Sequence, residues 1–202
     1  MNTASPTVAD RNWFQKLCLG LLSLFGWRSV FVPPPEPKGV ILVYPHTSNW
    51  DFIVGVLYRY GYDLRAQWIA KHSAFRWPLG PVLRRMGGIP IDRRKAQGTI
   101  GALVDTYRES DSLWIAITPE GTRSHTDHWK SGFYRIALAA DVPCALGCID
   151  YKTKTISIDT YVRFSGDSKK DLAMLREYYA GKRGLHPDKE GDIGFRVQGS
   201  DG

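Results

Sequence analysis

Apolar runs alternate along the chain with segments in which apolar residues recur every three or four positions. Residues 39–44 and 113–118 are almost continuously apolar, as is typical of strands buried on both faces of a sheet. We expect further strands and helices at the following ranges: strands at 67–70, 89–91, 143–149 and 155–162, and helices at 76–86, 99–109, 133–140 and 169–180. This alternation predicts an α/β fold with a mostly parallel sheet flanked by helices.

The N-terminal segment 13–27 is apolar, with aromatic residues at both ends and basic residues at Lys16 and Arg28. The eleven residues between these two cations would form a helix of about 16 Å, against a hydrocarbon core of about 30 Å, so they are too short to cross a bilayer. A secretory signal fits poorly, since Trp27 and Arg28 occupy the place of a small-residue cleavage site. Two interpretations remain open: an amphipathic helix lying in a membrane interface, or a helix packed on the domain core.

Four prolines between Pro33 and Pro37 predict a stiff linker after this helix. Beyond Lys182 the chain is rich in glycine and charge and poor in apolar anchors, which predicts a loosely ordered tail. We therefore divide the chain into an N-terminal tail and interfacial helix (1–32), a proline linker (33–38), a main α/β domain (39–181) and a loose tail (182–202).

Charge and cysteine content narrow the classes of function. The 27 Lys and Arg residues exceed the 20 Asp and Glu residues, and the formal net charge of +7 favours an anionic partner. Cys18, Cys144 and Cys148 lie among apolar neighbours and are expected to be buried, reduced thiols. Because no second pair of metal ligands accompanies Cys144 and Cys148, we expect no metal site. We also expect no cofactor. The chain contains no G-x-S-x-G elbow, which argues against a serine hydrolase. It also contains no nucleic-acid-reading motif, so we expect no nucleic-acid partner.

Three polar clusters fall where strands are expected to end, which is where ligands gather in α/β folds. In the first, H-T-S-N-W-D, Ser48 can cap the following helix, and Asp51 in its first turn can hold His46 in the tautomer of a general base. The alternative is that Asp51 only caps the helix and His46 is an ordinary loop residue. The second cluster is G-G-I-P-I-D-R-R-K at residues 87–95, where solvated surface charge is the usual meaning of such a run. In the third, T-P-E-G-T-R-S, Arg123 can fork onto a phosphate or bridge Glu120.

Four blocks in this order, H-T-S-N-W-D, G-G-I-P-I-D-R, P-E-G-T-R-S and V-P-C-A-L-G, resemble the glycerophospholipid acyltransferase family, whose familiar members are 1-acylglycerol-3-phosphate acyltransferases. The resemblance covers about residues 46–147 and includes the H-x4-D and E-G-T-R signatures. It implies an O-acyltransferase that moves a fatty acyl group from acyl-CoA or acyl carrier protein to the hydroxyl of a lysophospholipid such as 1-acylglycerol-3-phosphate.

The resemblance also implies roles for individual residues. His46 would be the general base, Asp51 would orient it, and Asn49 is a candidate donor to the oxyanion. Pro143 and its neighbours would line an apolar region near the acyl chain. The residues implied in acceptor binding are Arg93, Glu120, Gly121, Thr122 and Arg123. Candidate cations for the donor's phosphates or for an acidic carrier are Lys71, Arg84, Arg85 and Lys130.

The interfacial helix and the lipid substrate together predict a cytoplasmic protein, peripheral or monotopic on the inner membrane surface. Alternative functions are acyl transfer to a lysolipid without glycerol, or a lipid-binding or thioester-hydrolysing relative.

Overall fold

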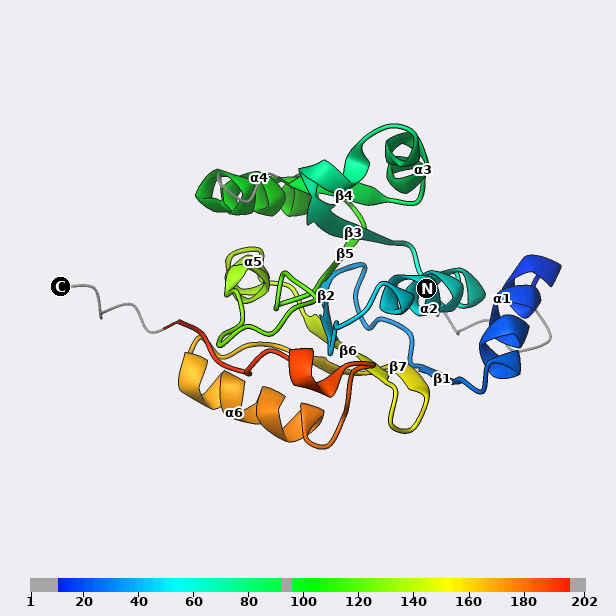
Figure 1. The fold of residues 1–202 in the computed structure, drawn as a ribbon. Coiled ribbons are helices and arrows are strands. Elements are labelled where there is room, and N and C mark those ends of the chain that lie inside the picture. Colours follow the sequence, from blue (N-terminus) through cyan, green and yellow to red (C-terminus); the bar gives the residue numbers. More distant parts are fainter. Residues whose placement is uncertain (1–10, 92–95, 197–202) are drawn as a thin grey trace.

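A seven-stranded sheet forms the centre of the protein (Figure 1). The computed structural model describes residues 11–91 and 96–196. The strands, in the spatial order β1-β7-β6-β2-β5-β3-β4, are β1 (Arg28–Phe31), β2 (Lys38–Tyr44), β3 (Ala66–Lys71), β4 (Gly88–Ile91), β5 (Leu113–Ile117), β6 (Cys144–Asp150) and β7 (Thr155–Val162). Neighbouring strands are parallel except β6 and β7, which pair antiparallel. The predicted α/β fold with a mostly parallel sheet is confirmed.

Helices cover both faces of the sheet (Figure 1). One layer holds α1 (Trp13–Leu24), α2 (Trp50–Gly61) and α3 (Leu79–Arg85), and the other holds α4 (Ala96–Glu109), α5 (Gly132–Ala139) and α6 (Ser168–Tyr179). The short 3₁₀ helix η2 (His72–Phe75) lies between β3 and α3, and η4 (Pro187–Lys189) lies in the C-terminal segment after α6. We refer to the first three helices as the α1–α3 layer.

The period-2 alternation of strand residues builds two apolar cores. Along β2, Val40 and Leu42 pack into the core beneath α4–α6, whereas Ile41 packs into the core beneath α2. Both faces of β2 are therefore buried, as its uninterrupted apolar sequence predicts. The three cysteines are buried and unpaired, as expected.

The sequence did not predict strand β1. Its residues Arg28–Phe31 pair in parallel with β7 at the edge of the sheet, with Ser29 opposite Ile156. The prolines that follow it therefore do not separate the N-terminal helix from the body of the protein. The reason is that the chain joins the sheet before it reaches them.

Helix α1 begins at Trp13 because Asn12 and Gln15 form a reciprocal cap. The Asn12 side chain accepts a hydrogen bond from Gln15 N, and Gln15 Oε1 accepts one from Asn12 N. The helix buries Cys18 and Leu22 and packs against α2, where Gly61 leaves room for a close approach. Its opposite face exposes its large apolar side chains, Trp13 and Leu24 above all.

In the part of the chain that the structure describes, no helix is both long and apolar enough to cross a bilayer. This agrees with the sequence, in which the apolar stretch of α1 is too short to cross the hydrocarbon core of a bilayer.

The prediction of a loosely ordered segment beyond Lys182 is wrong for the residues described there, up to Arg196. Tyr151 N donates to Arg183 O, Arg176 Nε donates to Ile193 O, and Trp129 N donates to Gly194 O. These bonds hold the segment across the end of the sheet and along α6. Its order comes from polar contacts with distant parts of the chain, which its own composition does not reveal.

Candidate active site

The site lies where β2 and β5 end. These strands pair in parallel, with Leu42 opposite Ile117, so the loops that follow them meet at one edge of the sheet. The loop after β2 carries His46, and the loop after β5 carries Glu120 and Arg123. Such edges of parallel sheets are where α/β proteins bind their ligands.

His46 and Asp51 form a close pair at this edge. His46 Nδ1 lies 3.1 Å from Asp51 Oδ2, and the two side chains are 17% and 1% exposed. Asp51 Oδ2 also accepts hydrogen bonds from Thr47 N (2.8 Å) and Ser48 N (2.9 Å). The carboxylate thus closes the turn that leads into α2, near the positive end of the helix dipole. This geometry lets Asp51 fix the imidazole with Nε2 directed away from the carboxylate.

The helix begins one residue later than predicted. Asn49 stands at the N-cap position without a side-chain hydrogen bond, and Ser48 Oγ accepts a bond from Trp50 N. Asp51 takes most of the capping role assigned to Ser48. The Asn49 side chain lines the cavity described below.

Tyr151 is a third member of this cluster that the sequence did not indicate. Its hydroxyl donates a 2.8 Å hydrogen bond to Asp51 Oδ1. Burial, together with the neighbouring Asp51 charge, raises the pKa of Tyr151, so its hydroxyl remains a donor at neutral pH. Tyr151 lies a hundred positions from Asp51 in sequence, and no local spacing marks it.

Glu120 holds the backbone of His46 in place. Its Oε2 accepts a hydrogen bond from His46 N (2.9 Å), and its Oε1 accepts one from Gly191 N (3.0 Å). The side chain is buried, and burial raises the pKa of Glu120 to about 8, although the two N–H donors oppose this shift. Direct contact between Glu120 and the acceptor, implied by the resemblance, does not fit this geometry because both carboxylate oxygens bind backbone inside the protein.

The segment beyond Lys182 completes the support of the site. His186 N donates to Thr47 Oγ1 (3.1 Å), and a Cβ at Gly184 would come within 2.6 Å of that same oxygen. Only glycine fits there without displacing Thr47. The sequence does not signal this contact, since its partners lie more than 130 positions apart.

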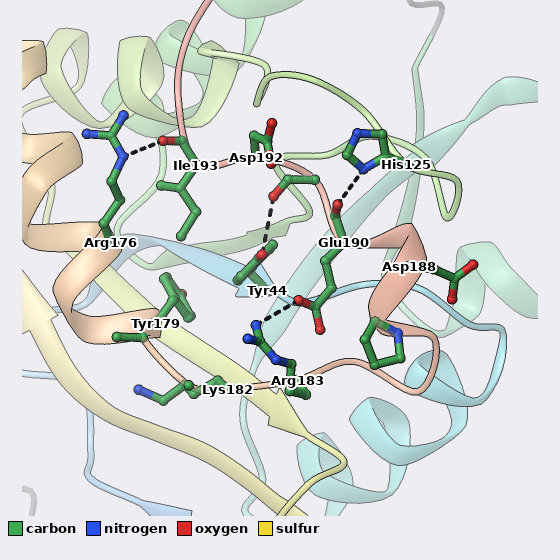
Figure 2. A pocket seen from close by; sticks show the side chains of 14 residues that line it. Tyr44, His125, Arg176, Tyr179, Lys182, Arg183, Asp188, Glu190, Asp192 and Ile193 are labelled. Atoms are coloured by element: carbon green, nitrogen blue, oxygen red, sulfur yellow. Dashed lines mark hydrogen bonds and ion pairs between the residues drawn. The ribbon is translucent and has the colours of Figure 1, made fainter.

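A cavity of about 710 Å³ lies between this segment and the end of α6 (Figure 2). Arg183 pairs with Glu190 on its wall, and the Tyr44 hydroxyl donates to Gly191 O. His46 is not among its lining residues. The residues that line it make the polar contacts that hold the C-terminal segment against β2.

A larger cavity, about 810 Å³, opens at His46 and extends between α2 and the sheet. Its volume lies within the range of small-molecule sites. The polar residues at its His46 end are His46, Asn49, Asp51, Thr118, Thr122 and Arg123. Its apolar wall includes Val43, Phe52, Val56, Trp68, Ile69, Ala116, Ile149, Ile156 and Ile158. The arrangement suits a ligand with one polar end and a long apolar part.

The remaining predicted site residues divide into three groups. Gly121, Thr122 and Arg123 line the cavity together with His46. Arg93 lies outside the described residues. Pro143 is placed elsewhere, which corrects its expected position near the acyl chain. Val40 pairs with Cys144 and Tyr44 with Cys148, so Pro143 lies at the opposite end of β6 from His46. The part of that strand that lines the cavity is Gly147–Ile149.

Comparison with known proteins identifies the type of domain. A family model described as Acyltransferase matches residues 33–147, more than half of the chain. The crystal structure of the 1-acyl-sn-glycerophosphate (LPA) acyltransferase PlsC from Thermotoga maritima is similar, with a TM-score of 0.52 and 18% sequence identity over 82% of this chain and 73% of that one. At this identity the likeness concerns the fold. A search of the curated proteins finds no match.

Proposed function

The chain belongs to the acyltransferase family, and from this premise we propose that it moves a fatty acyl group from a thioester donor, acyl-CoA or acyl carrier protein, to the hydroxyl of a lysophospholipid such as 1-acylglycerol-3-phosphate. The observation that carries the proposal is the His46–Asp51 pair, 3.1 Å apart at the mouth of a long, mainly apolar cavity. A general base beside an apolar channel suits a reaction between an alcohol and a fatty thioester.

His46 Nε2 accepts the proton of the acceptor hydroxyl as its oxygen attacks the thioester carbonyl carbon. Asp51 keeps Nδ1–H directed to itself and stabilises the imidazolium that forms. The tetrahedral intermediate then collapses, the carbon–sulfur bond breaks, and the leaving sulfur receives the proton from the imidazolium. No covalent acyl-enzyme is required, since the thioester already carries a good leaving group.

The developing oxyanion needs a hydrogen-bond donor at the mouth of the cavity. The N–H groups of Thr47 and Ser48 already bond to Asp51, and that of Trp50 bonds to Ser48. We therefore assign this role to the side chain of Asn49, which lines the cavity.

The acceptor's phosphate would lie against Arg123, with Gly121 and Thr122 shaping the loop around it. Arg93 belongs to the same proposed acceptor site. Glu120 acts as a positioning residue through the backbone of His46. The apolar wall between α2 and the sheet would take the acyl chain.

We assign catalysis to residues 39–181, supported by the ordered segment 182–196. Helix α1 exposes Trp13, Leu17 and Leu24, and its C-cap residue Phe25 is also exposed. These side chains would hold the enzyme at the cytoplasmic face of a membrane. Indole rings and aliphatic side chains of this kind favour the interface between headgroups and acyl chains.

The test is an assay of the purified chain with radiolabelled acyl-CoA and acyl carrier protein against a panel of lysolipids with and without glycerol. We expect acyl transfer that falls by roughly 10²–10⁴-fold in His46→Gln. His128→Gln serves as the matched control and should retain activity. Near-normal turnover by His46→Gln would overturn the dyad. Thioester loss at one rate with or without acceptor would show a hydrolase instead.

A further inference from the structure

We propose that residues 71–85, comprising the end of β3, η2 and α3, form a second surface that docks onto an anionic lipid bilayer beside α1. We call this the α3 surface. The inference rests on the proposed function, which already places a lipid substrate in the adjoining cavity. It adds a contact that the N-terminal helix does not provide.

The first observation is the exposure of large apolar side chains. On the α3 surface, Trp77 is 88% exposed, and Leu79 and Val82 are more than half exposed. Among the described residues, thirteen large apolar side chains are exposed, and ten of them belong to the α1–α3 layer and its connections: Trp13, Phe14, Leu17, Leu24, Phe25, Trp50, Ile53, Trp77, Leu79 and Val82. Single exposed apolar residues are ordinary, but their concentration on one side of a molecule marks an interaction surface.

The second observation is the distribution of charge. Residues 11–91 contain ten Lys and Arg residues against three Asp and Glu residues, which accounts for the whole formal net charge of +7. The rest of the chain is balanced. Residues 64–91 contain five of these cations and no acid, and one of the three acids, Asp51, is buried. The part of the chain that builds the α1–α3 layer therefore carries both most of the exposed large apolar side chains and the excess of cations.

The third observation is the position of the α3 surface relative to α1 and the cavity. Figure 1 shows α1 and α3 on the same side of the sheet. Trp68 links η2 to α2, since its ring centroid lies 4.9 Å from that of Phe52 and 5.9 Å from that of Phe75. Lys71 and Leu83 line the cavity that opens at His46. A bilayer that touches the α3 surface would therefore lie next to the cavity.

A single partner, the bilayer, accounts for both the exposed apolar side chains and the excess of cations. Tryptophan and aliphatic side chains partition into the headgroup boundary, while arginines attract anionic lipids. The same combination occurs at α1, where Trp13 and Leu24 are exposed and Arg11 lies just before the helix. An acidic carrier protein is the competing partner for the cations, and the test below separates the two.

The experiment measures co-sedimentation of the full chain with phosphatidylcholine vesicles, with and without replacement of one quarter of the lipid by phosphatidylglycerol. Arg76→Gln/Arg85→Gln should weaken binding to the anionic vesicles by about tenfold to thirtyfold. Arg135→Gln/Lys170→Gln removes the same charge from exposed positions on α5 and α6 and should change binding by less than about twofold. Equal losses in the two variants would overturn the proposal.

A second pair of variants tests the apolar contact. Trp77→Ala should weaken binding to both kinds of vesicle, whereas Leu138→Ala on α5 should not. Both positions are exposed, and circular dichroism would verify that each variant folds. Unchanged vesicle binding by Trp77→Ala contradicts insertion of the α3 surface.

The same measurements in the His46→Gln background separate this inference from the proposed function. Vesicle binding requires no turnover, so the α3 variants should lose binding there by the same factor. Failure of the acyl-transfer assay with intact vesicle binding would reject the activity alone. If Arg76→Gln/Arg85→Gln leaves vesicle binding unchanged but raises the KM for acyl carrier protein, the surface binds the donor and the bilayer proposal is wrong.

Discussion

Tyr151 and His46 contact different oxygens of Asp51. The Tyr151 hydroxyl donates to Oδ1 at 2.8 Å, and His46 Nδ1 lies 3.1 Å from Oδ2. The Trp27 ring packs edge-on against Tyr151, with centroids 4.8 Å apart. The Asp51 carboxylate, which orients the proposed base, is therefore contacted at both oxygens. Through Tyr151 it is also connected to Trp27, which lies just after the end of α1.

We predict that Tyr151→Phe lowers kcat about tenfold with little change in the acceptor's KM. The substitution removes one hydrogen bond to a carboxylate, worth about 1.5–3 kcal/mol, and releases its orientation toward His46. Steady-state kinetics measure both constants. Tyr161→Phe is the matched control, since that hydroxyl donates to Val32 O, away from the pair. Equal losses of kcat in both variants would contradict a positioning role.

Arg123→Ala should raise the acceptor's KM about tenfold or more and leave the donor's KM nearly unchanged. The reason is the loss of the charge-assisted contact that we propose between Arg123, which lines the cavity, and the acceptor's phosphate. Arg123→Lys should recover part of the effect, because it keeps the charge but not the paired donors. Kinetics with each substrate varied in turn provide the measurement. An effect on the donor alone would assign Arg123 to the thioester.

Glu120 predicts a pH dependence of stability. Burial raises its pKa from 4.5 to about 8, so between these values the folded state binds more protons at this group than the unfolded state does. The stabilisation that comes from this raised pKa is therefore fully present below about pH 4.5 and is lost as the pH rises through about 8.

Urea unfolding measured at several pH values in this range gives the free energy of unfolding as a function of pH. It should decrease less steeply with rising pH in Glu120→Gln than in the parent chain. The variant should also be less stable overall by about 1–3 kcal/mol, because its amide cannot accept from both His46 N and Gly191 N. Identical pH slopes would show that Glu120 does not titrate with folding.

Gly61→Ala should lower stability by about 1 kcal/mol, because a Cβ there would lie 2.6 Å from Leu19 Cδ2 and would push α1 away from α2. Gly20→Ala, within α1, is the matched control. A Cβ at Gly20 meets nothing within 4 Å, so this change should stabilise the helix by about 0.5–1 kcal/mol. Denaturant unfolding measures both. A neutral Gly61→Ala would indicate that α1 packs more loosely on α2.

Most of the fold could be predicted from local sequence, because most of its helices and strands show a clear hydrophobic periodicity or a continuous apolar run. Strands β2 and β5 are recognisable from apolar runs, and the spacing of His46 and Asp51 follows from their place at one strand–helix junction. Strand β1 is four residues long and only partly buried, so its hydrogen bonds to β7, more than a hundred positions away, define it.

The errors in the candidate site share one physical origin. The place of Pro143 depends on the register of β6 against β2, and the burial of Glu120 depends on Gly191. Tyr151 and His186 reach the site from positions far along the chain. Each of these contacts is set by tertiary pairing, which no local spacing records.

Strand β1 has a mechanical consequence. Because β1 pairs with β7 directly after α1, the helix is attached to the sheet whose strand β2 leads to His46, and no long linker separates the two. If α1 rests in a leaflet as proposed, the height of the imidazole above the lipid is fixed by the fold. The enzyme would then select acceptors partly by how far their hydroxyl stands out of the bilayer.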